Sequence, residues 1–523
     1  MKNKILILLP IVSAVLLGLS RTRMSFDMFV FVGFVPLFYL FDVATASQPQ
    51  GLPLQKKGDS KLFWYGVVFS TVYLLISIHW ITLVTLGGFI GILFLFGTLF
   101  GLLFWVVGKI VKYKPWFYSF GLIFGWIVFE HLTNFTEFRF PWFHVGYGLK
   151  NSLPFIQVLE IGGMPLLSFM ILMVNYLFYR GMTKKRMYFI IGLVVLLIWF
   201  ILGSVRMIYV REQSALNDFK VTMVQGNIHQ SIKWEESIRA NTFQIYFDLS
   251  EQAYMEDEPN LIVFPESALP VHLMILRDFY RELIDFVTEI QTPIFTGFPH
   301  AEVHMKHRGQ NDPMLHFNAA NLFCPENHAG EMYFKNILVP FGERIPFLDR
   351  FPILWKLQMG QANFEHGEEI VIYEVDGFSF APLICFEIAF PMYLRDIVRE
   401  HNPDFFVTIT NDAWFYRSIG THQHAVKAAF RTIETRKSVF RAANTGYSFY
   451  TTPDGRIHNK TDLFDRTFIT GNLWTYDTLT PYVSYGFAIY FTFFVFFTLQ
   501  ITTILICWLS GKKKRVNNGE DLL

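Results

Sequence analysis

The strongest constraint on this chain is a series of long apolar runs before residue 212, with one more run near the C-terminus. A helix that crosses a bilayer needs roughly 20 mostly apolar residues. Runs of this kind predict eight membrane-spanning helices, at 4–20, 25–44, 62–82, 85–108, 116–134, 153–179, 187–208 and 484–509. We therefore expect an all-α membrane bundle interrupted by one large insertion between its seventh and eighth helices.

The composition supports this division and excludes other classes of protein. Of 523 residues, 52% are hydrophobic and only 17% are charged, against roughly 25% charged in an average soluble protein. Collagen, coiled-coil and disordered chains are thereby excluded. The net charge of +1 provides no field for nucleic acid, so no nucleic-acid partner is expected. Three cysteines without clustered Cys/His spacing predict neither a disulfide framework nor a metal site.

Basic residues between the runs indicate the orientation of the bundle, because short cytoplasmic loops are enriched in lysine and arginine. With a cytoplasmic N-terminus, the basic residues that fall on the cytoplasmic side are Lys2, Lys4, Lys56, Lys57, Lys61, Lys109, Lys112, Lys114, Arg180, Lys184, Lys185, Arg186 and the tail Lys512–Arg515. The opposite side receives only Arg21, Arg23, Arg139 and Lys150. Residues 212–482 then lie outside, unless one short run is re-entrant, which would invert this segment.

The segment 212–482 has a different pattern. Short β-rich runs alternate with helical ones, which is typical of a layered α/β domain. The predicted strands are Phe219–Val224, Leu261–Phe264, Pro293–Gly297, Ala320–Cys324, Ile370–Val375, Phe378–Cys385 and Phe405–Thr410. The predicted helices are Ile232–Tyr254, Leu273–Thr288, Pro391–His401 and Gln423–Ser438.

Three reactive side chains follow or interrupt apolar runs in this segment. Glu266 comes directly after a predicted strand, where α/β folds place ligands, although a helix cap explains it equally well. Lys335 interrupts an apolar stretch, where a lysine either snorkels to solvent or pairs with an anion. Cys385 ends a strand; a buried structural cysteine is the ordinary interpretation, and a nucleophile needs a base and a cation nearby. Glu266 and Lys335 would supply both.

In this order, these segments resemble the nitrilase (carbon–nitrogen hydrolase) superfamily and, more narrowly, the apolipoprotein N-acyltransferase family of bacterial inner membranes. The motifs that carry the resemblance are Val224–Asn227, Trp234, Leu338–Glu343, Asn411–Phe415, Gln423-His424, Arg441–Gly446, and, before this segment, Phe140–Trp142 with Gly146-Tyr147. Each motif is weak alone, but together they cover nearly the whole chain.

The resemblance implies a nitrilase-like αββα-sandwich domain whose catalytic residues are Glu266, Lys335 and Cys385. Cys385 would be the nucleophile and Glu266 the general base, while Lys335 and the backbone amide of Phe386 would hold the oxyanion. The implied reaction moves an acyl chain from a phospholipid, through a Cys385 thioester, to the α-amine of the diacylglyceryl-modified N-terminal cysteine of an apolipoprotein. It needs no metal and no cofactor.

The resemblance also implies two supporting acids. Glu343 would orient Lys335 or Glu266, and Glu387 would order the loop beside Cys385. A partnered structural carboxylate explains each of the two equally well.

Three aromatic residues, Trp234, Trp414 and Phe415, are expected to guard the entry of lipid, although an aromatic in such a loop is often only an interface anchor. The chain departs from the family at a few positions. Phe386 replaces the usual Tyr after the cysteine, and Ile337 replaces a common basic residue. Tyr416 and Thr421 stand where the family often has Gly and Pro, respectively.

The implied organisation has three parts: seven helices in 1–211, a periplasmic catalytic domain in 212–482, and an eighth helix with a basic cytoplasmic tail in 483–523. The protein would be a monomer of the inner membrane with both termini in the cytoplasm. Two alternatives stay open: a membrane-tethered nitrilase-type amidase that hydrolyses a small amide, and a non-catalytic lipid-binding relative. A transporter is disfavoured, because the main acidic residues of the spans, Glu130 and Glu160, lie near span ends.

Overall fold

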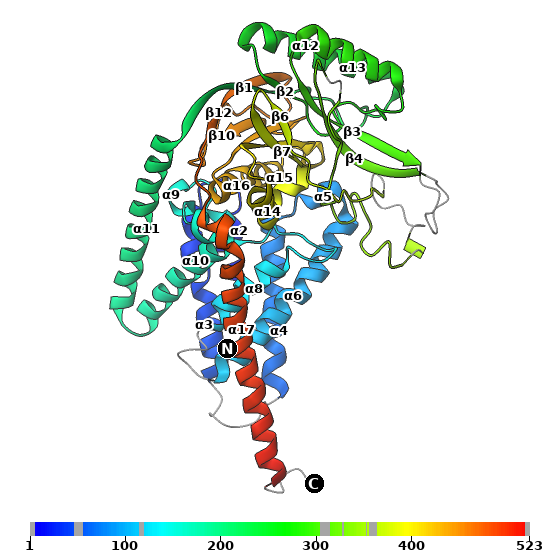
Figure 1. The fold of residues 1–523 in the computed structure, drawn as a ribbon. Coiled ribbons are helices and arrows are strands. Elements are labelled where there is room, and N and C mark those ends of the chain that lie inside the picture. The colour runs from blue at the N-terminus through cyan, green and yellow to red at the C-terminus, as the bar shows by residue number, and fades with distance from the viewer. Residues whose placement is uncertain are drawn as a thin grey trace.

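The computed structural model describes residues 6–46, 56–113, 120–303, 314–326, 329–351, 353–354 and 363–517. Helices form one part of the molecule, and two sheets with their covering helices form the other (Figure 1). The chain passes from the first part to the second through the long helix α11 (Arg186–Gln213) and returns through α17 (Pro481–Asn517).

Apolar helices build the first part. Besides α11 and α17 they are α2 (Leu8–Leu19), α3 (Val35–Ala46), α4 (Lys56–Ser77), α5 (Ile81–Val84), α6 (Leu86–Tyr113), α8 (Gly121–Leu132), α9 (Leu153–Ile156) and α10 (Leu159–Thr183), with the short 3-10 helices η1 (Asp27–Phe31) and η2 (Val145–Leu149). Within the described residues, five segments are long and apolar enough to cross a membrane: Asp27–Ala44, Leu86–Val111, Leu159–Thr183, Arg186–Gln213 and Pro481–Ile506. The apolar helices Leu8–Leu19, Lys61–Ser77 and Gly121–Leu132 are shorter. Each predicted span therefore coincides with an apolar helix, and the count of eight crossings stays a prediction.

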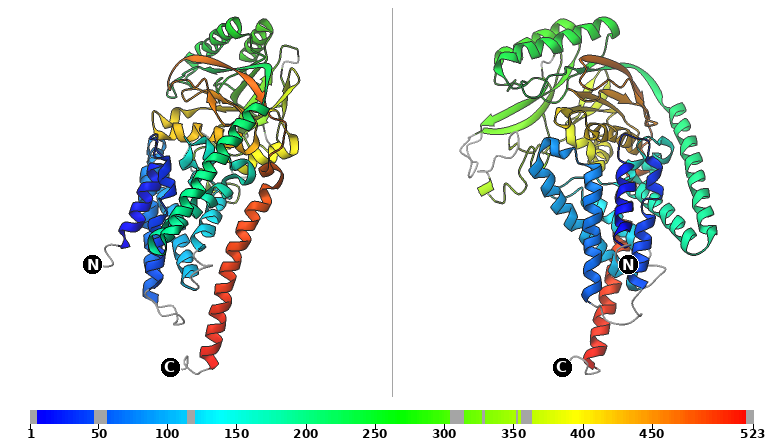
Figure 2. Two further views of the ribbon diagram at one scale, coloured as in Figure 1. Left: turned by 90° about the vertical axis from the view of Figure 1, so that its left-hand side faces the viewer. Right: turned by 180° about the vertical axis from the view of Figure 1, so that it is seen from behind.

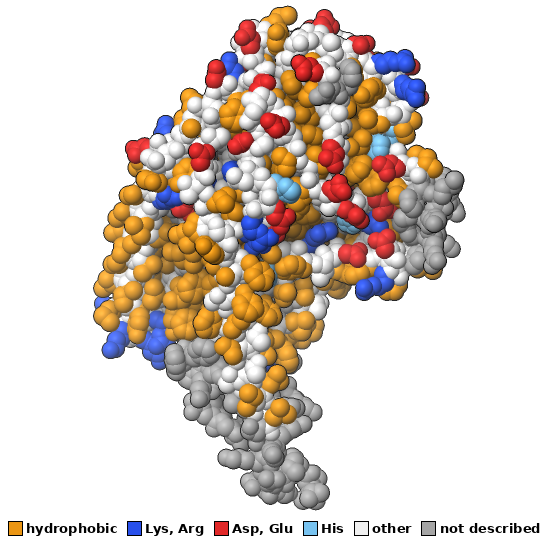
Figure 3. Space-filling model, viewed as in Figure 1, with side chains coloured by type: hydrophobic (Ala, Val, Ile, Leu, Met, Phe, Trp, Pro, Cys, Tyr) orange, Lys and Arg blue, Asp and Glu red, His pale blue; other side chains and the backbone are white. Residues whose placement is uncertain are grey.

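The surface of this part is apolar, as a lipid-facing surface must be. Large side chains of α11 such as Leu193 and Leu197 are exposed, and so are Phe487 and Phe491 on α17. Figure 3 shows hydrophobic side chains covering much of the helical part on the face in view, while most acidic side chains lie on the sheet-containing part. Exposed apolar area of this extent is typical of a protein that spans a membrane.

Two six-stranded sheets build the second part. Their strand orders are β12-β1-β2-β3-β4-β5 and β11-β10-β9-β8-β7-β6. The strands are β1 (Ala215–Gln225), β2 (Leu261–Val263), β3 (Ile294–Val303), β4 (Met314–Phe323), β5 (Tyr333–Phe334), β6 (Tyr373–Val375), β7 (Phe378–Ile384), β8 (Phe405–Thr410), β9 (Ser438–Ala443), β10 (Phe449–Thr451), β11 (Ile457–His458) and β12 (Thr467–Thr475). The central strands β1-β2-β3 and β7-β8-β9 run parallel. The carboxyl ends of parallel strands therefore meet at one edge of each sheet.

The sheets pack face to face, and helices cover both outer faces (Figure 2). Aromatic side chains fill the space between the sheets; for example, the Phe295 and Phe380 rings lie 5.4 Å apart between centroids. Helices α12 (Arg239–Asp257) and α13 (Arg277–Ile290) cover the first sheet, while α14 (Pro391–His401) and α16 (Lys427–Thr435) cover the second. Helix α13 buries Leu283, Phe286, Val287 and Ile290, which share one face at helical spacing. The predicted sandwich of two sheets with helices on both outer faces is confirmed.

One predicted helix is wrong at its end. The run Gln423–Ser438 divides into α15 (Ile419–Ala425) and α16, and Ser438 already begins β9. The reason is Arg436, whose backbone adopts a left-handed conformation (φ 59°) and stops α16. This turn lets the chain re-enter the second sheet beside β8 as strand β9, which carries Arg441.

Other boundaries also differ. Helix α12 begins at Arg239 rather than at Ile232, because residues before it form turns and the 3-10 helix η3 (Glu236–Ile238). In the helical part, the predicted run 153–179 is divided, and Gly163 takes a φ of 59° inside α10. A side chain at this position would overlap the Tyr482 ring, which lies 2.3 Å from where a Cβ would stand.

Candidate active site

The three predicted catalytic residues come from strand ends that meet at one edge of the sandwich. Glu266 follows β2, Lys335 follows β5, and Cys385 follows β7. β2 and β7 belong to different sheets, so packing of the two sheets is what brings Glu266 and Cys385 together. Cys385 lies within electrostatic reach of both Glu266 and Lys335.

A buried cluster of charges surrounds Lys335. Its Nζ donates to Glu343 Oε1 at 2.8 Å and to Glu266 Oε1 at 3.4 Å. Asn318 Nδ2 donates to the same two carboxylates, at 2.8 Å to Glu266 and 3.1 Å to Glu343. The Glu266 Oε2 atom accepts the backbone N–H of Asn411 at 2.9 Å. Every carboxylate oxygen of Glu266 is therefore occupied by a donor, which fixes its position.

These contacts determine the resting charges of the cluster. Burial raises the pKa of Glu266, but Lys335 and the hydrogen bonds from Asn318 and Asn411 outweigh burial and bring it below its usual value. Burial lowers the pKa of Lys335, but Glu343 and Glu266 outweigh it and raise the pKa above the usual range for lysine. Burial raises the pKa of the Cys385 thiol, and Glu266 adds to this rise while Lys335 opposes it. The resting site thus holds a carboxylate, an ammonium group and a neutral thiol.

The backbone of Cys385 is strained. Its φ of 54° lies in the left-handed region, which non-glycine residues rarely adopt. Its carbonyl oxygen lies 3.1 Å from His424 Nε2, and His424 Nδ1 lies 2.8 Å from Asp412 Oδ1. The imidazole therefore connects the strained turn to a fixed carboxylate.

Asp412 is fixed in turn by Arg441, whose Nη2 donates to Asp412 Oδ2 at 2.6 Å. Burial raises the pKa of Asp412, but Arg441 and His424 outweigh burial and bring it to about 2. Beside this pair, Asn444 Nδ2 donates to Asn411 Oδ1 at 3.1 Å. The end of β9 thus supports the loop after β8.

Glu387 and Phe386 occupy the 3-10 helix η5 (Cys385–Ala389). Glu387 Oε1 accepts the backbone N–H groups of Asn336 at 2.7 Å and Ile337 at 3.1 Å, and its Oε2 accepts that of Ile384 at 2.6 Å. It therefore ties the segment after Lys335 to the segment before Cys385.

The Phe386 side chain points toward the helical part. Its ring lies 6.3 Å from those of both Phe140 and Trp142, measured between centroids, and is stacked in each pair. The segment with the Phe140–Trp142 motif thus covers the residue that follows Cys385.

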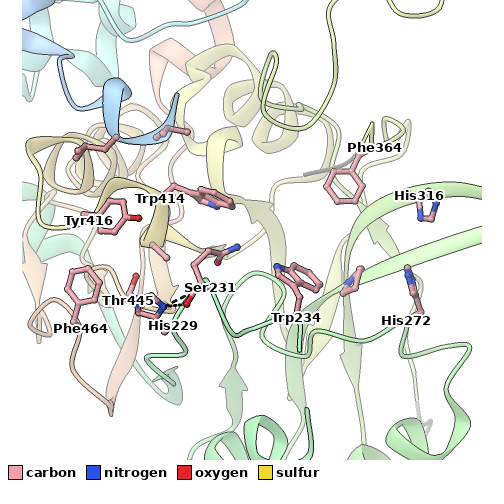
Figure 4. Close-up of a pocket in the computed structure, with 15 residues that line it drawn as sticks. His229, Ser231, Trp234, His272, His316, Phe364, Trp414, Tyr416, Thr445 and Phe464 are labelled. Atoms are coloured by element: carbon pink, nitrogen blue, oxygen red, sulfur yellow. Dashed lines mark hydrogen bonds between the residues drawn. The ribbon is translucent and has the colours of Figure 1, made fainter. Parts of the chain in front are cut away.

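A pocket of about 600 Å³ adjoins this cluster (Figure 4). It is lined by Leu83, Val84, His229, Gln230, Ser231, Trp234, His272, Pro299, His316, Phe364, Ala413, Trp414, Tyr416, Thr445 and Phe464. Gln230 connects the pocket to the cluster. Its Oε1 accepts a hydrogen bond from Asn411 Nδ2 at 2.7 Å, and the backbone N–H of Asn411 donates to Glu266. Leu83 and Val84 belong to α5, so the helical part forms one wall.

The three predicted gate aromatics separate in the structure. Trp234 and Trp414 line the pocket, and 43% of Trp234 is exposed. Phe415 instead packs against Trp80, with 4.7 Å between ring centroids, and against His424. The 3-10 helix η6 (Asp412–Phe415) thus turns Trp414 and Phe415 to different sides, and the role of all three aromatics as a gate stays a prediction.

Gln423 joins the site to the helical part. The indole N–H groups of Trp80 and Trp142 donate to its Oε1 at 3.2 and 2.9 Å, and its Nε2 donates to the carbonyls of Arg21 at 3.1 Å and Ser77 at 2.8 Å. We call this contact of α15 and α16 with the helical part the seam. Because the amide uses both of its atoms, rotation at the seam would break several hydrogen bonds at once.

Sequence reasoning missed two residues of the cluster. Asn318 contacts both carboxylates. The sequence signal that could have pointed to it is a polar amide within an otherwise apolar strand. Lys233 is buried, and its Nζ donates to the Glu266 carbonyl at 3.2 Å. Burial lowers the pKa of Lys233 to about 8, against the opposing effect of Glu266. Both residues surround Glu266 with donors.

Comparison with known proteins identifies a family for each part of the chain. Residues 220–474, which contain the two facing sheets, match the family model for carbon-nitrogen hydrolases. Residues 13–177 match the apolipoprotein N-acyltransferase N-terminal domain. An amidase from Nesterenkonia sp. is similar over 50% of this chain and 91% of its own, with a TM-score of 0.37 and 13% identity.

Two relatives match nearly the full length. An apolipoprotein N-acyltransferase of Geobacter metallireducens is 30% identical over 499 residues, which is 92% of this chain and 91% of the relative. One of Vibrio parahaemolyticus is 27% identical over 478 residues, 88% of this chain and 91% of the relative. The chain belongs to the apolipoprotein N-acyltransferase family.

Proposed function

We propose that this chain transfers an acyl chain from a membrane phospholipid to the α-amine of the diacylglyceryl-modified N-terminal cysteine of apolipoproteins, the last step of lipoprotein maturation. Membership of the family supports this reaction. The observation that carries the chemistry is the buried cluster in which Lys335 bridges Glu266 and Glu343 beside Cys385. A carboxylate base, a fixed cation and a cysteine are what acyl transfer through a thioester requires.

In the first half-reaction, Glu266 takes the thiol proton while Cys385 sulfur attacks the ester carbonyl of the phospholipid. Lys335 and the backbone N–H of Phe386 stabilise the oxyanion. When the tetrahedral intermediate collapses, the C–O bond breaks and Glu266 returns its proton to the lysophospholipid alkoxide. The product is an acyl thioester on Cys385.

In the second half-reaction, the α-amine of the apolipoprotein attacks the thioester carbonyl, and Glu266 accepts a proton from the nitrogen. The C–S bond then breaks, the amide leaves, and the thiolate of Cys385 regains the proton. Glu343 positions Lys335 throughout, and Glu387 holds the loops on both sides of the thiol. Trp234 and Trp414 line the path of the acyl chain and limit access of water, which would hydrolyse the thioester.

The same proposal includes the placement of the protein. Eight helices, seven within 1–211 and one within 483–523, would cross the bacterial inner membrane, and residues 212–482 would lie in the periplasm with both termini in the cytoplasm. The bias of basic residues and the apolar exposed helices support this arrangement. The enzyme would act as a monomer on two membrane-anchored substrates and without a cofactor.

The test is a mass measurement on the full-length protein in detergent, incubated with a phospholipid carrying a labelled acyl chain. We expect an acyl adduct on Cys385 that disappears when a diacylglyceryl-cysteine peptide is added, with appearance of the N-acylated peptide. Cys385→Ala should form neither product. Cys324→Ala, which changes the other described free cysteine, should form both.

Release of ammonia from small amides without transfer to the peptide would identify an amidase instead. Retention of transfer by Cys385→Ala would remove Cys385 from the mechanism.

A further inference from the structure

Three basic side chains without acidic partners lie on or against segments that also carry pocket-lining residues. Arg23 Nη2 donates to the Tyr447 hydroxyl at 2.8 Å, and Lys460 Nζ lies 4.5 Å from the centroid of the same ring. The Arg417 guanidinium lies 5.0 Å from the Phe464 centroid. Within the part of the chain that the structure describes, none of these three cations forms an ion pair. We call Arg23, Arg417 and Lys460 the basic rim.

Arg417 adjoins the pocket directly, and Tyr447, which contacts Arg23 and Lys460, lies two residues after the pocket-lining Thr445. Phe464, beneath Arg417, lines the pocket, and so does Tyr416; Figure 4 shows both rings on the same side of it. Arg417 donates only a long hydrogen bond, from Nη2 to the Leu463 carbonyl at 3.4 Å. Most of its N–H groups therefore stay available to a ligand at the mouth.

The backbone before Arg417 is unusual. Tyr416 has φ 48° and ψ −148°, a combination that glycine tolerates far better than tyrosine, and 55% of its side chain is exposed. This turn places the Tyr416 ring in the pocket and Arg417 on its rim. Strain of this kind persists only where surrounding contacts impose it, and it concentrates at ligand sites.

The basic rim also lies where the apolar surface ends. Arg23 stands in the loop between the apolar segments α2 and η1. Lys150, which is nearby, already pairs with Asp27 at 3.1 Å. The exposed acids of the neighbouring segment, Asp462 and Asp465, form no ion pair with the rim within the described residues. His422 is the remaining titratable group that faces Arg23 and Lys460.

We propose that the basic rim binds the phosphodiester group of the phospholipid acyl donor while the ester of the same molecule enters the pocket. This inference rests on the proposed function and specifies how its donor is recognised. Guanidinium and ammonium groups form charge-assisted hydrogen bonds with phosphate oxygens, and arginine does so through two parallel N–H groups. A rim of cations just outside an aromatic pocket suits an amphipathic donor with a phosphate between its chains and its headgroup.

The experiment compares donors and variants in mixed detergent micelles with the full-length protein. Donors are phosphatidylethanolamine, phosphatidylglycerol and diacylglycerol, which carries the ester without the phosphate. Variants are Arg417→Gln and Lys460→Gln, singly and together. The control is Arg281→Gln, an exposed arginine on α13 of the opposite sheet face. KM and kcat for peptide N-acylation are measured for each donor.

We expect KM for both phospholipids to rise about fivefold for each rim variant, since one basic group near a lipid surface contributes about that factor. The double variant should show about a 25-fold rise, with kcat within twofold of the wild-type value. KM for diacylglycerol should not change, nor should any value for Arg281→Gln. Arg417→Lys should recover part of the loss.

Three results would overturn the inference. The first is an unchanged KM for phospholipids in the double variant. The second is an equal rise of KM for diacylglycerol, which would indicate a general effect on membrane attachment. The third is a KM for phospholipids that rises as much in Arg281→Gln as in the rim variants, which would indicate a general effect of surface charge. Failure of the wild-type protein to acylate the peptide would instead contradict the proposed function.

Discussion

Lys335 and Lys427 are both buried amines of the sheet-containing part, yet their surroundings are opposite. Lys335 Nζ contacts two carboxylates, at 2.8 and 3.4 Å. Lys427 Nζ instead faces two aromatic rings of the seam, 3.7 Å from the Tyr147 centroid and 4.0 Å from that of Trp142. One amine is held among acids and the other among π-faces.

The difference shows that the charged neighbours of a buried amine, rather than its burial, determine whether the amine carries a charge. Burial lowers the pKa of both lysines. At Lys335 the glutamates reverse this effect, whereas at Lys427 the cations Arg21 and Arg431 add to it, and the pKa falls well below the usual value. We therefore expect chemistry to depend on the first amine and packing on the second.

The largest effect is expected for Glu343→Gln, which removes the closer carboxylate from Lys335. The ammonium group would then pair with Glu266 alone, and the base would be held back from the thiol proton. We expect the rate of peptide N-acylation to fall about a hundredfold. The control is Glu374→Gln, an exposed acid on β6. A rate within threefold of wild type would show that Lys335 needs only one carboxylate.

Glu387→Gln should lower the rate about tenfold, because the amide can accept fewer of the backbone N–H groups that the carboxylate holds. Burial raises the pKa of Glu387 to about 7, against the effect of the N–H donors and Lys335. The ordered loops require the carboxylate form, so wild-type activity should fall as the pH drops below about 7.

The acid limb of the pH–rate profile separates the two glutamates. Glu266 has a pKa below its usual value, so it should cause no loss of activity near neutral pH. The limb near pH 7 should therefore vanish in Glu387→Gln. If it persists in that variant, another group controls the profile.

Asp412→Asn should act mainly on stability. The folded-state pKa of Asp412 is about 2 against an ordinary value of 3.8, so its carboxylate stabilises the fold above pH 4 by about 2 kcal/mol. This contribution is lost as the pH falls toward 2. We expect the variant to lose about 2 kcal/mol at neutral pH and to show a flatter dependence of Tm on pH below 4. Thermal unfolding in detergent measures both, with the exposed Asp278→Asn as control.

Lys427→Met should have the smallest effect. Methionine keeps the contact with the two rings, and exchanging a buried amine without a carboxylate partner for an apolar group is often neutral or stabilising. We expect activity within about twofold of wild type and an unchanged or higher Tm, whereas Lys335→Met should lose transfer. Equal damage in the two variants would remove the distinction between the sites.

Much of the fold could be predicted from the sequence where local patterns are strong. Pro391–His401 and Phe405–Thr410 form the predicted helix and strand with the predicted bounds. Apolar helices lie in all eight predicted runs, because apolar length is a local property. The strand β9 was hidden, because the apolar spacing of α16 continues past Arg436 and no glycine marks its left-handed turn.

The candidate site was predictable only in part. Glu266, Lys335 and Cys385 stand out as reactive types at strand ends, and the structure brings them together. Asn318 could not be identified, since one amide in a strand forms no motif. The contact of Trp142 with Gln423 joins segments 281 positions apart, which no local pattern records. The separation of Phe415 from the pocket depends on a single 3-10 turn.

The neutral resting state of the Cys385 thiol has a consequence for the chemical durability of the protein. Alkylating agents and peroxides react with thiolates far faster than with thiols. Because burial and Glu266 raise the pKa of Cys385, we expect these reagents to react slowly with its sulfur, even though the residue keeps some solvent access. If Cys385 is the nucleophile, we expect peroxides to modify it slowly between turnovers, and we expect covalent inhibitors to require a lipid-like group that binds beside Glu266 and Cys385.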